Sequence, residues 1–281
     1  MEQNLKEVFG SYMSWKLDMN TWVIQFMGGS EYMYLLEGDE KALLIDTGYG
    51  AENLKEYVEK LTSKPILVVN THYHPDHAAG NGEFEAVYMN RNYRVDAGSV
   101  EDVNAVPFDI SKLPHPDYQH IDIGDGYDFD LGGRVVEVME AKPAHCDSSL
   151  FFIDKGHRML FVGDEFESAQ VNIFDNSRNK ELVFDGVQRL ANFKDNADRL
   201  WALRDSYDYV LPNHNGTPIA KEYIKQYSEL VDAAYDGTIK IEDKINHKYI
   251  EMDPRSDKLC RGRYKDSSII IMKEDLLKAC R

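Results

Sequence analysis

The sequence predicts an α/β fold in which the β-sheets are mixed rather than strictly parallel. Short apolar blocks separated by turn residues indicate several strands. Longer stretches with apolar residues at helical spacing indicate a smaller number of helices between them. Because the expected strands follow one another in runs instead of alternating one by one with helices, the pattern favours layered mixed sheets over a regular parallel βαβ series.

The first third of the chain shows this pattern most clearly. We expect strands at 22–27, 32–36 and 41–46, with Gly28 and Gly29 dividing the first two. Residues 51–62 are expected to form a helix, since its apolar residues fall on one face: Leu54, Tyr57, Val58 and Leu61. Residues 65–70 contain the apolar run of a buried strand.

The second part of the chain continues in the same style. We expect strands at 134–140, 149–153, 159–162 and 207–211, and helices at 196–205 and 219–234. Near the end, 267–272 is expected to be a closing strand of the second sheet and 273–280 a short helix. The segments 90–120 and 165–193 look long and irregular, which is typical of functional loops.

Composition restricts the classes of function. The chain has 281 residues, 43% of them hydrophobic, and a net charge of −17, so nucleic acid and anionic membranes are unfavourable partners. No apolar run reaches the roughly 20 residues that span a bilayer, and we see no secretory signal. The three cysteines, Cys146, Cys260 and Cys280, show no disulfide pattern. We therefore predict a cytoplasmic protein that acts on a small molecule, whose oligomeric state the sequence does not indicate.

The strongest functional signal lies immediately after the strand at 65–70. His72, His74, Asp76 and His77 follow one another there, and alternate residues of an extended segment point the same way. His72 and His74 can therefore share one metal, while Asp76 and His77, at the expected start of a helix, can face a second. Imidazole and carboxylate ligands suit zinc, and also iron or manganese. Ordinary surface histidines are a poor alternative, since three of the nine histidines fall in this one stretch.

This segment, His72-Tyr73-His74-Pro75-Asp76-His77, resembles the HxHxDH motif of the metallo-β-lactamase superfamily. The resemblance extends over roughly residues 20 to 220, because further segments follow in the order found in the family. They are Leu44 to Gly48, Ala78 to Asn81, Ile123 to Gly126, Leu131 to Gly133, Pro143 to His145, Leu160 to Asp164 and Leu211 to Gly216. Residues 236–281 lie outside it, and we treat the whole chain, 1–281, as one domain.

The resemblance implies a four-layer αβ/βα sandwich, in which two mixed sheets face each other and helices cover the outside. It also implies two metal ions, expected to be zinc. His72, His74 and His145 would hold the first, Asp76, His77 and His214 the second, and Asp164 would bridge them. Asp46 would orient a ligand histidine. His115, His120, His157 and His247 match no position of the motif and are expected to be surface or packing residues.

The implied activity is hydrolysis by a metal-bridging hydroxide, with Asp164 and Asp76 as catalytic residues and Asp76 orienting the nucleophile. We expect a small ester, lactone, thioester or amide as substrate. A small-metabolite phosphodiesterase and a diiron redox enzyme on the same ligands are alternatives from other reaction classes. A metal-stabilised binding protein without turnover is the remaining alternative.

Several residues of this chain differ from the motifs of known subgroups of the superfamily, which limits the subgroups to which it could belong. Zinc β-lactamases carry cysteine or serine where this chain has Asp164, and glyoxalase II-type thioesterases have Gly-Cys-Gly where Glu165 to Ser168 stand here. Acyl-homoserine lactonases carry tyrosine at the position of Glu167. All three subgroups are therefore disfavoured, as are the nucleic-acid-processing and flavodiiron members. Cys146, next to His145, is expected to be a small buried residue rather than a metal ligand.

Two sets of residues are candidates for contacts with the substrate. Aromatic residues of the two long segments could line a cleft or pack the loops themselves; they are Tyr93, Phe108, Tyr118, Phe166, Phe174 and Phe184. Arg91, Arg94 and Lys142 could pair with a substrate carboxylate, although ordinary solvated charges are the simpler interpretation.

Overall fold

The structure is a computed structural model of the chain. It describes residues 7–9, 12–27, 29–50, 53–92, 118–174, 185–247, 250–251, 253 and 255–280. Parts of the two long segments predicted to be irregular, 93–117 and 175–184, lie outside the described residues, as do Tyr93, Arg94, Phe108, His115 and Phe184.

Within the described residues, eight strands form the first sheet in sequence order. They are β1 (Glu7–Phe9), β2 (Tyr12–Asp18), β3 (Thr21–Phe26), β4 (Tyr32–Glu37), β5 (Ala42–Ile45), β6 (Ile66–Val69), β7 (Ala86–Asn90) and β8 (Gln119–Ile123). The strands from β1 to β5 pair antiparallel and those from β5 to β8 pair parallel, so the sheet is mixed. The parallel connections carry α1 (Leu54–Leu61) and α2 (Pro75–Ala78).

Six described strands form the second sheet in the order β15-β14-β12-β11-β10-β9. Their bounds are β9 (Asp128–Asp130), β10 (Val135–Glu140), β11 (Leu150–Asp154), β12 (Met159–Gly163), β14 (Tyr209–Pro212) and β15 (Ile219–Ala220). β12 and β14 pair parallel, and the connection between them contains the long helix α3 (Gly186–Ala202). The other pairs are antiparallel.

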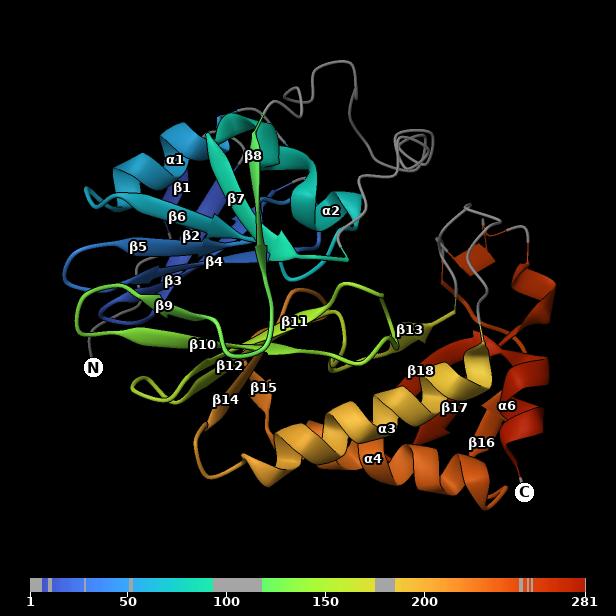
Figure 1. Ribbon diagram of the computed structural model, residues 1–281. Coiled ribbons are helices and arrows are strands. Elements are labelled where there is room, and N and C mark those ends of the chain that lie inside the picture. The colour runs from blue at the N-terminus through green and yellow to red at the C-terminus, as the bar shows by residue number, and fades with distance from the viewer. Residues whose placement is uncertain are drawn as a thin grey trace.

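The apolar side chains of the two sheets form one core between the sheets and further cores on their outer faces. Tyr34, Leu43 and Val69 of the first sheet meet Phe152 and Phe161 of the second in the central core. α1 covers the outer face of the first sheet, and α3 and α4 (Glu222–Tyr235) cover the outer face of the second (Figure 1). The four-layer αβ/βα sandwich is thereby confirmed.

A buried arginine also joins the two sheets. Arg134 donates through Nε to Asp154 at 2.7 Å and through its other guanidinium nitrogens to Thr21 Oγ1 and the Asn20 carbonyl. Both side chains of the ion pair are almost fully buried, at 3% and 0% exposure. The pair belongs to the second sheet, and the bonds from Arg134 to Asn20 and Thr21 attach it to the first.

The prediction that 267–272 closes the second sheet is wrong. This segment is β18 (Ser267–Met272), which lies in a separate sheet of four described strands in the order β13-β18-β17-β16. The others are β13 (Val171–Ile173), β16 (Lys240–Glu242) and β17 (Leu259–Tyr264). One face of this sheet packs on α3 and α4, and Ile270 on the other face meets Phe174 and Leu259. An apolar run shows that a strand is buried but not which strands it pairs with.

The segment 165–193 is also more regular than predicted, since it contains β13 and the first half of α3. α3 begins ten residues earlier than the predicted helix. Asp185 caps it by accepting a hydrogen bond from the Gln188 backbone N–H at 3.0 Å. The expected terminal helix forms as α6 (Lys273–Ala279). In the part of the chain that the structure describes, none of the helices has the length and apolar character to span a membrane.

Candidate metal centre

The histidine-rich segment lies in the connection between β6 and α2. β6 ends at Val69, and Pro75 occupies the first turn of α2, where its missing N–H has no cost. The residue before a proline avoids the helical region, and His74 has the extended angles φ −59° and ψ 145°. The chain therefore stays extended through His74 and turns helical at Asp76 and His77, as the sequence predicted.

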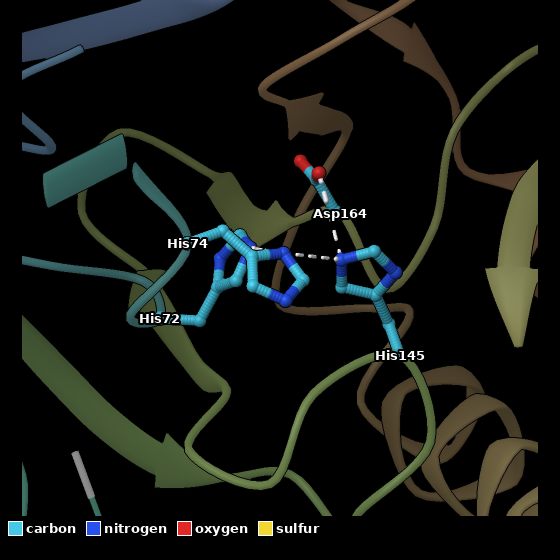
Figure 2. A group of neighbouring side chains, drawn as sticks. All are labelled: His72, His74, His145 and Asp164. Atoms are coloured by element: carbon cyan, nitrogen blue, oxygen red, sulfur yellow. Dashed lines mark hydrogen bonds and ion pairs between the residues drawn. The ribbon is translucent and has the colours of Figure 1, made fainter. Parts of the chain in front are cut away.

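Among the described residues, one group that could hold a metal ion consists of His72, His74, His145 and Asp164. His72 Nε2 lies 2.9 Å and His145 Nε2 lies 3.1 Å from His74 Nδ1. Figure 2 shows the three rings turned toward one another, with the carboxylate of Asp164 beside them. Three ring nitrogens that converge on one point are suited to share a cation.

The second such group among the described residues consists of Asp76, His77, Asp164 and His214. His214 Nε2 lies 3.2 Å from Asp76 Oδ2 and 3.3 Å from His77 Nε2. Asp164 belongs to both groups, and its Oδ2 is 3.4 Å from His77 Nε2 and 3.7 Å from His145 Nε2. The structure thus brings together all seven residues that the resemblance implies as ligands.

Asp164 comes from the end of β12, where a glycine makes the approach possible. Gly163 has φ +57°, and a Cβ at this position would lie 3.0 Å from Thr71 Cβ. The other oxygen of Asp164, Oδ1, is buried and has no hydrogen-bond partner within the described residues. A buried carboxylate oxygen without a donor is costly unless a positive charge lies nearby, which is what a metal ion in these groups would supply.

Hydrogen bonds behind the rings fix their orientation. Asp46 accepts from the Thr71 backbone N–H, from Thr71 Oγ1 and from Asn213 Nδ2, and its Oδ2 lies 2.9 Å from His77 Nδ1. Thr71 Oγ1 also lies 3.0 Å from His72 Nδ1. With Nδ1 engaged in this way, Nε2 of both His72 and His77 is left to face the ligand groups.

His145 and His214 are held by residues that come from other parts of the chain. His145 Nδ1 lies 2.9 Å from the Asn172 carbonyl, and His214 Nδ1 lies 3.3 Å from Ser30 Oγ. Sequence reasoning missed these partners, together with Thr71 and Asn213. Thr71 and Asn213 each directly precede a ligand histidine, a position that could have identified them. Nothing in the sequence marks Ser30 or the Asn172 carbonyl.

Electrostatics differ between the two groups. Burial, with His145 beside it, lowers the pKa of His74 to about 3, and burial, with His77 beside it, lowers the pKa of His72. These rings are therefore neutral and can donate a lone pair. Burial lowers the pKa of His214, but the carboxylates of Asp164 and Asp76 outweigh it and raise the value to about 10. Asp76 and Asp164 thus favour positive charge in the second group, where a bound cation would take the place of the protons on the histidines.

Buried glutamates, to which no role was assigned from the sequence, flank the centre. The backbone N–H groups of His145 and Cys146 donate to Glu165, and Asn215 Nδ2 donates to Glu167. Burial raises the pKa of Glu167 to about 8, with a further contribution from Asp164. Burial likewise raises the pKa of Glu31 to about 7.

Other predicted candidates lie outside the centre. Cys146 is buried, its Sγ contacts Ser148 Oγ at 3.4 Å, and burial raises the pKa of its thiol to about 11, so it is a packing residue. Phe166 and Phe174 are buried in apolar clusters and do not line an open cleft. Tyr118 accepts a hydrogen bond from Asn81. Arg91 pairs with Glu140 and Lys142 with Asp195.

The described histidines outside the motif, His120, His157 and His247, do not join the ligand groups. His157 Nδ1 lies 2.7 Å from Asp18 Oδ2, and His120 Nε2 lies 3.4 Å from Asp122 Oδ1. Among the described residues, neither these two nor His247 belongs to a cluster that could hold a metal.

Comparison with known proteins agrees with this geometry. Residues 27–214 match the family model described as the metallo-beta-lactamase superfamily. Human "acyl-coenzyme A thioesterase MBLAC2" is 25% identical over 236 residues, which cover 74% of this chain and 81% of the relative. A "hydroxyacylglutathione hydrolase" of Francisella tularensis subsp. tularensis is 29% identical over 165 residues, covering 55% of this chain and 59% of that protein.

Solved structures show the same fold. A metallo-beta-lactamase from Pontibacter korlensis superposes with a TM-score of 0.56 at 17% identity, covering 78% of this chain and 98% of that one. The sec-alkylsulfatase Pisa1 from Pseudomonas sp. superposes with a TM-score of 0.61 at 15% identity, covering 80% of this chain and 42% of that one. The chain therefore belongs to the metallo-beta-lactamase superfamily, and it is an enzyme, a metal-dependent hydrolase.

Proposed function

We propose that the protein is a dinuclear zinc hydrolase that cleaves a small thioester. The observation that carries the dinuclear centre is the pair of ligand groups that share Asp164. His72, His74 and His145 would hold the first ion, Asp76, His77 and His214 the second, with Asp164 between them. Imidazole and carboxylate donors of this kind suit zinc, and iron or manganese would fit the same set.

Two bound ions would make water nucleophilic near neutral pH and polarise the carbonyl under attack. The side chains of the protein have distinct tasks beside them. Asp164, 8% exposed, would keep the two ligand groups at a fixed separation. Asp76 is the more accessible carboxylate, at 24% exposure. It would accept a hydrogen bond from the nucleophile and turn it toward the substrate, the role of a positioned base.

The choice of a thioester rests on the relatives. The human and bacterial relatives are named for the hydrolysis of acyl-coenzyme A and hydroxyacylglutathione. This chain lacks the Gly-Cys-Gly stretch of glyoxalase II-type enzymes, and the buried Phe166 stands in that region. We therefore propose an acyl thioester in general rather than hydroxyacylglutathione. Esters, lactones and amides react through the same carbonyl chemistry and are the next candidates. A cytoplasmic location and a small-molecule partner remain predictions.

The function is tested by turnover of zinc-loaded protein on a panel of an acyl thioester, an aryl ester, a lactone, a β-lactam and an aryl phosphodiester. We expect the thioester to give the highest kcat/KM. Preference for the phosphodiester would replace the proposal by a phosphodiesterase. Silence across the panel, together with iron as the metal that purifies with the protein, would replace it by a redox enzyme, since zinc has no redox chemistry.

Asp46 provides a second test, because it holds the ligands without belonging to either group. We expect Asp46→Asn to weaken metal affinity about 10- to 100-fold, since the amide cannot accept all the hydrogen bonds that the carboxylate receives from Thr71, Asn213 and His77. Competition with a chromophoric chelator measures this. Asp18→Asn, which alters a carboxylate paired with His157 away from the centre, is the control. Equal affinities in the two variants would contradict the role of Asp46.

A further inference from the structure

Glu31 is a buried carboxylate next to the second ligand group, with no role in the function proposed so far. Its exposed fraction is 1%. Neither carboxylate oxygen accepts a hydrogen bond from another residue of the described chain, although its own backbone N–H lies near it. No ion pair with Glu31 is found among the described residues either. A buried carboxylate in this condition is costly unless a cation compensates it.

The neighbouring contacts place Glu31 beside His214. Ser30 Oγ lies 3.3 Å from His214 Nδ1, and the Tyr32 backbone N–H donates to the Asn213 carbonyl at 2.7 Å. The Asn213 side chain returns a hydrogen bond to the Tyr32 carbonyl. The residues on both sides of Glu31 are thus attached to His214 and to the residue before it, which fixes the position of this backbone.

The carboxylate itself extends toward α2. A Cβ on Gly48 would lie 3.4 Å from Glu31 Oε1, an ordinary contact, so this oxygen lies beside Gly48. A Cβ on Gly29 would overlap with Oε2, so glycine at that position leaves room for the carboxylate. Gly48 forms a bridge with Ala78 of α2, the residue after His77. Asp76, His214 and His77 are the charged groups that act on Glu31 electrostatically. All three belong to the second ligand group, and the first group contributes none of those named.

We propose that Glu31 is a positioning residue of the second ligand group, whose negative charge raises the affinity of that group for a divalent cation. The inference rests on the proposed dinuclear centre. Glu31 is in neither set of direct ligands. It therefore acts on a bound cation through the electric field of its carboxylate and through the water around the site. Its burial prevents contact with a substrate, which distinguishes it from a specificity residue.

The test compares wild type with Glu31→Gln, which removes the charge at nearly constant shape. Zinc binding is followed by chelator competition and metal analysis, and cobalt(II) absorption reports the coordination of each position. In Glu31→Gln we expect the dissociation constant of the ion at Asp76, His77 and His214 to rise about 10- to 100-fold. That of the ion at His72, His74 and His145 should stay unchanged. Glu37→Gln is the control, because Glu37 lies at the other end of β4 and accepts a hydrogen bond from Thr62.

Thermal unfolding separates this role from simple packing. Without metal, Glu31→Gln should melt at or above the wild-type temperature, because an uncompensated buried charge has been removed; the increase produced by zinc should be smaller than in wild type. Unchanged binding of both ions, or a lower metal-free melting temperature with an unchanged zinc effect, would overturn the role of Glu31. Wild-type protein that binds fewer than two ions would instead overturn the dinuclear centre.

Discussion

Asp164→Ala is expected to abolish measurable thioester hydrolysis and to reduce the bound metal from two ions to one or none. Asp164 is the residue common to both ligand groups, and its Oδ2 lies within 3.7 Å of histidine nitrogens from each. Loss of the metal contribution to stabilising the transition state is worth about 4 kcal/mol, which is about 10³-fold in kcat/KM.

The measurement combines kcat/KM on the preferred substrate with metal analysis of the same sample. Asp164→Asn retains the shape of the side chain and shows whether the charge or the volume is needed. Asp122→Ala is the matched control, since its carboxylate is 71% exposed and lies on β8, away from the groups. Wild-type activity in Asp164→Ala with a single ion bound would contradict a mechanism that needs both ions.

Asp76→Asn is expected to lower kcat by about 10²- to 10⁴-fold while leaving KM largely unchanged, provided that metal is saturating. Burial raises the pKa of Asp76, but His77 and His214 outweigh it and hold the pKa below its usual range. The carboxylate is therefore ionised at neutral pH and can accept a hydrogen bond on its solvent-facing side. An amide of the same shape cannot act as a proton acceptor.

Asp76→Asn could lower kcat by removing a proton acceptor or by removing a metal ligand, and the assay must distinguish the two causes. Metal content is therefore measured in every Asp76→Asn assay, and the exposed Asp128→Asn on β9 serves as the control. A fall in kcat at full metal content supports the orienting role. Full activity at full metal content would remove Asp76 from the chemistry, whereas a loss that excess zinc restores would make it a ligand only.

The segment around His72 could be predicted from the sequence because its information is local. Apolar residues end at Val69, Pro75 begins a helix, and the ligand-type residues between and after them lie within a few positions. The extended-to-helical change at Pro75 follows from the restriction that a proline places on the residue before it. The helices and about half of the described strands were predicted for a similar reason, since their apolar pattern is a property of the chain itself.

The third sheet could not be predicted in the same way. β13 pairs with β18, which lies about a hundred positions later, as in the register Val171 with Ile269. The apolar run at 267–272 correctly indicated a buried strand, but pairing depends on the register and on which face α3 and α4 cover. These are properties of contacts between distant segments, and a one-dimensional pattern does not contain them.

By itself, the sequence determined the α/β class and the HxHxDH segment. The resemblance carried by its dispersed motifs then implied the set of residues that we predict as ligands. Only the tertiary structure decided that His145, Asp164 and His214, from three separate connections, lie close enough to His72 and His77 to form two groups that could hold metal ions. It alone placed the unpaired carboxylate of Glu31 beside them. The physical reason is that side-chain type and periodicity are local, whereas burial, hydrogen-bond pairing and electric field arise when distant segments pack together.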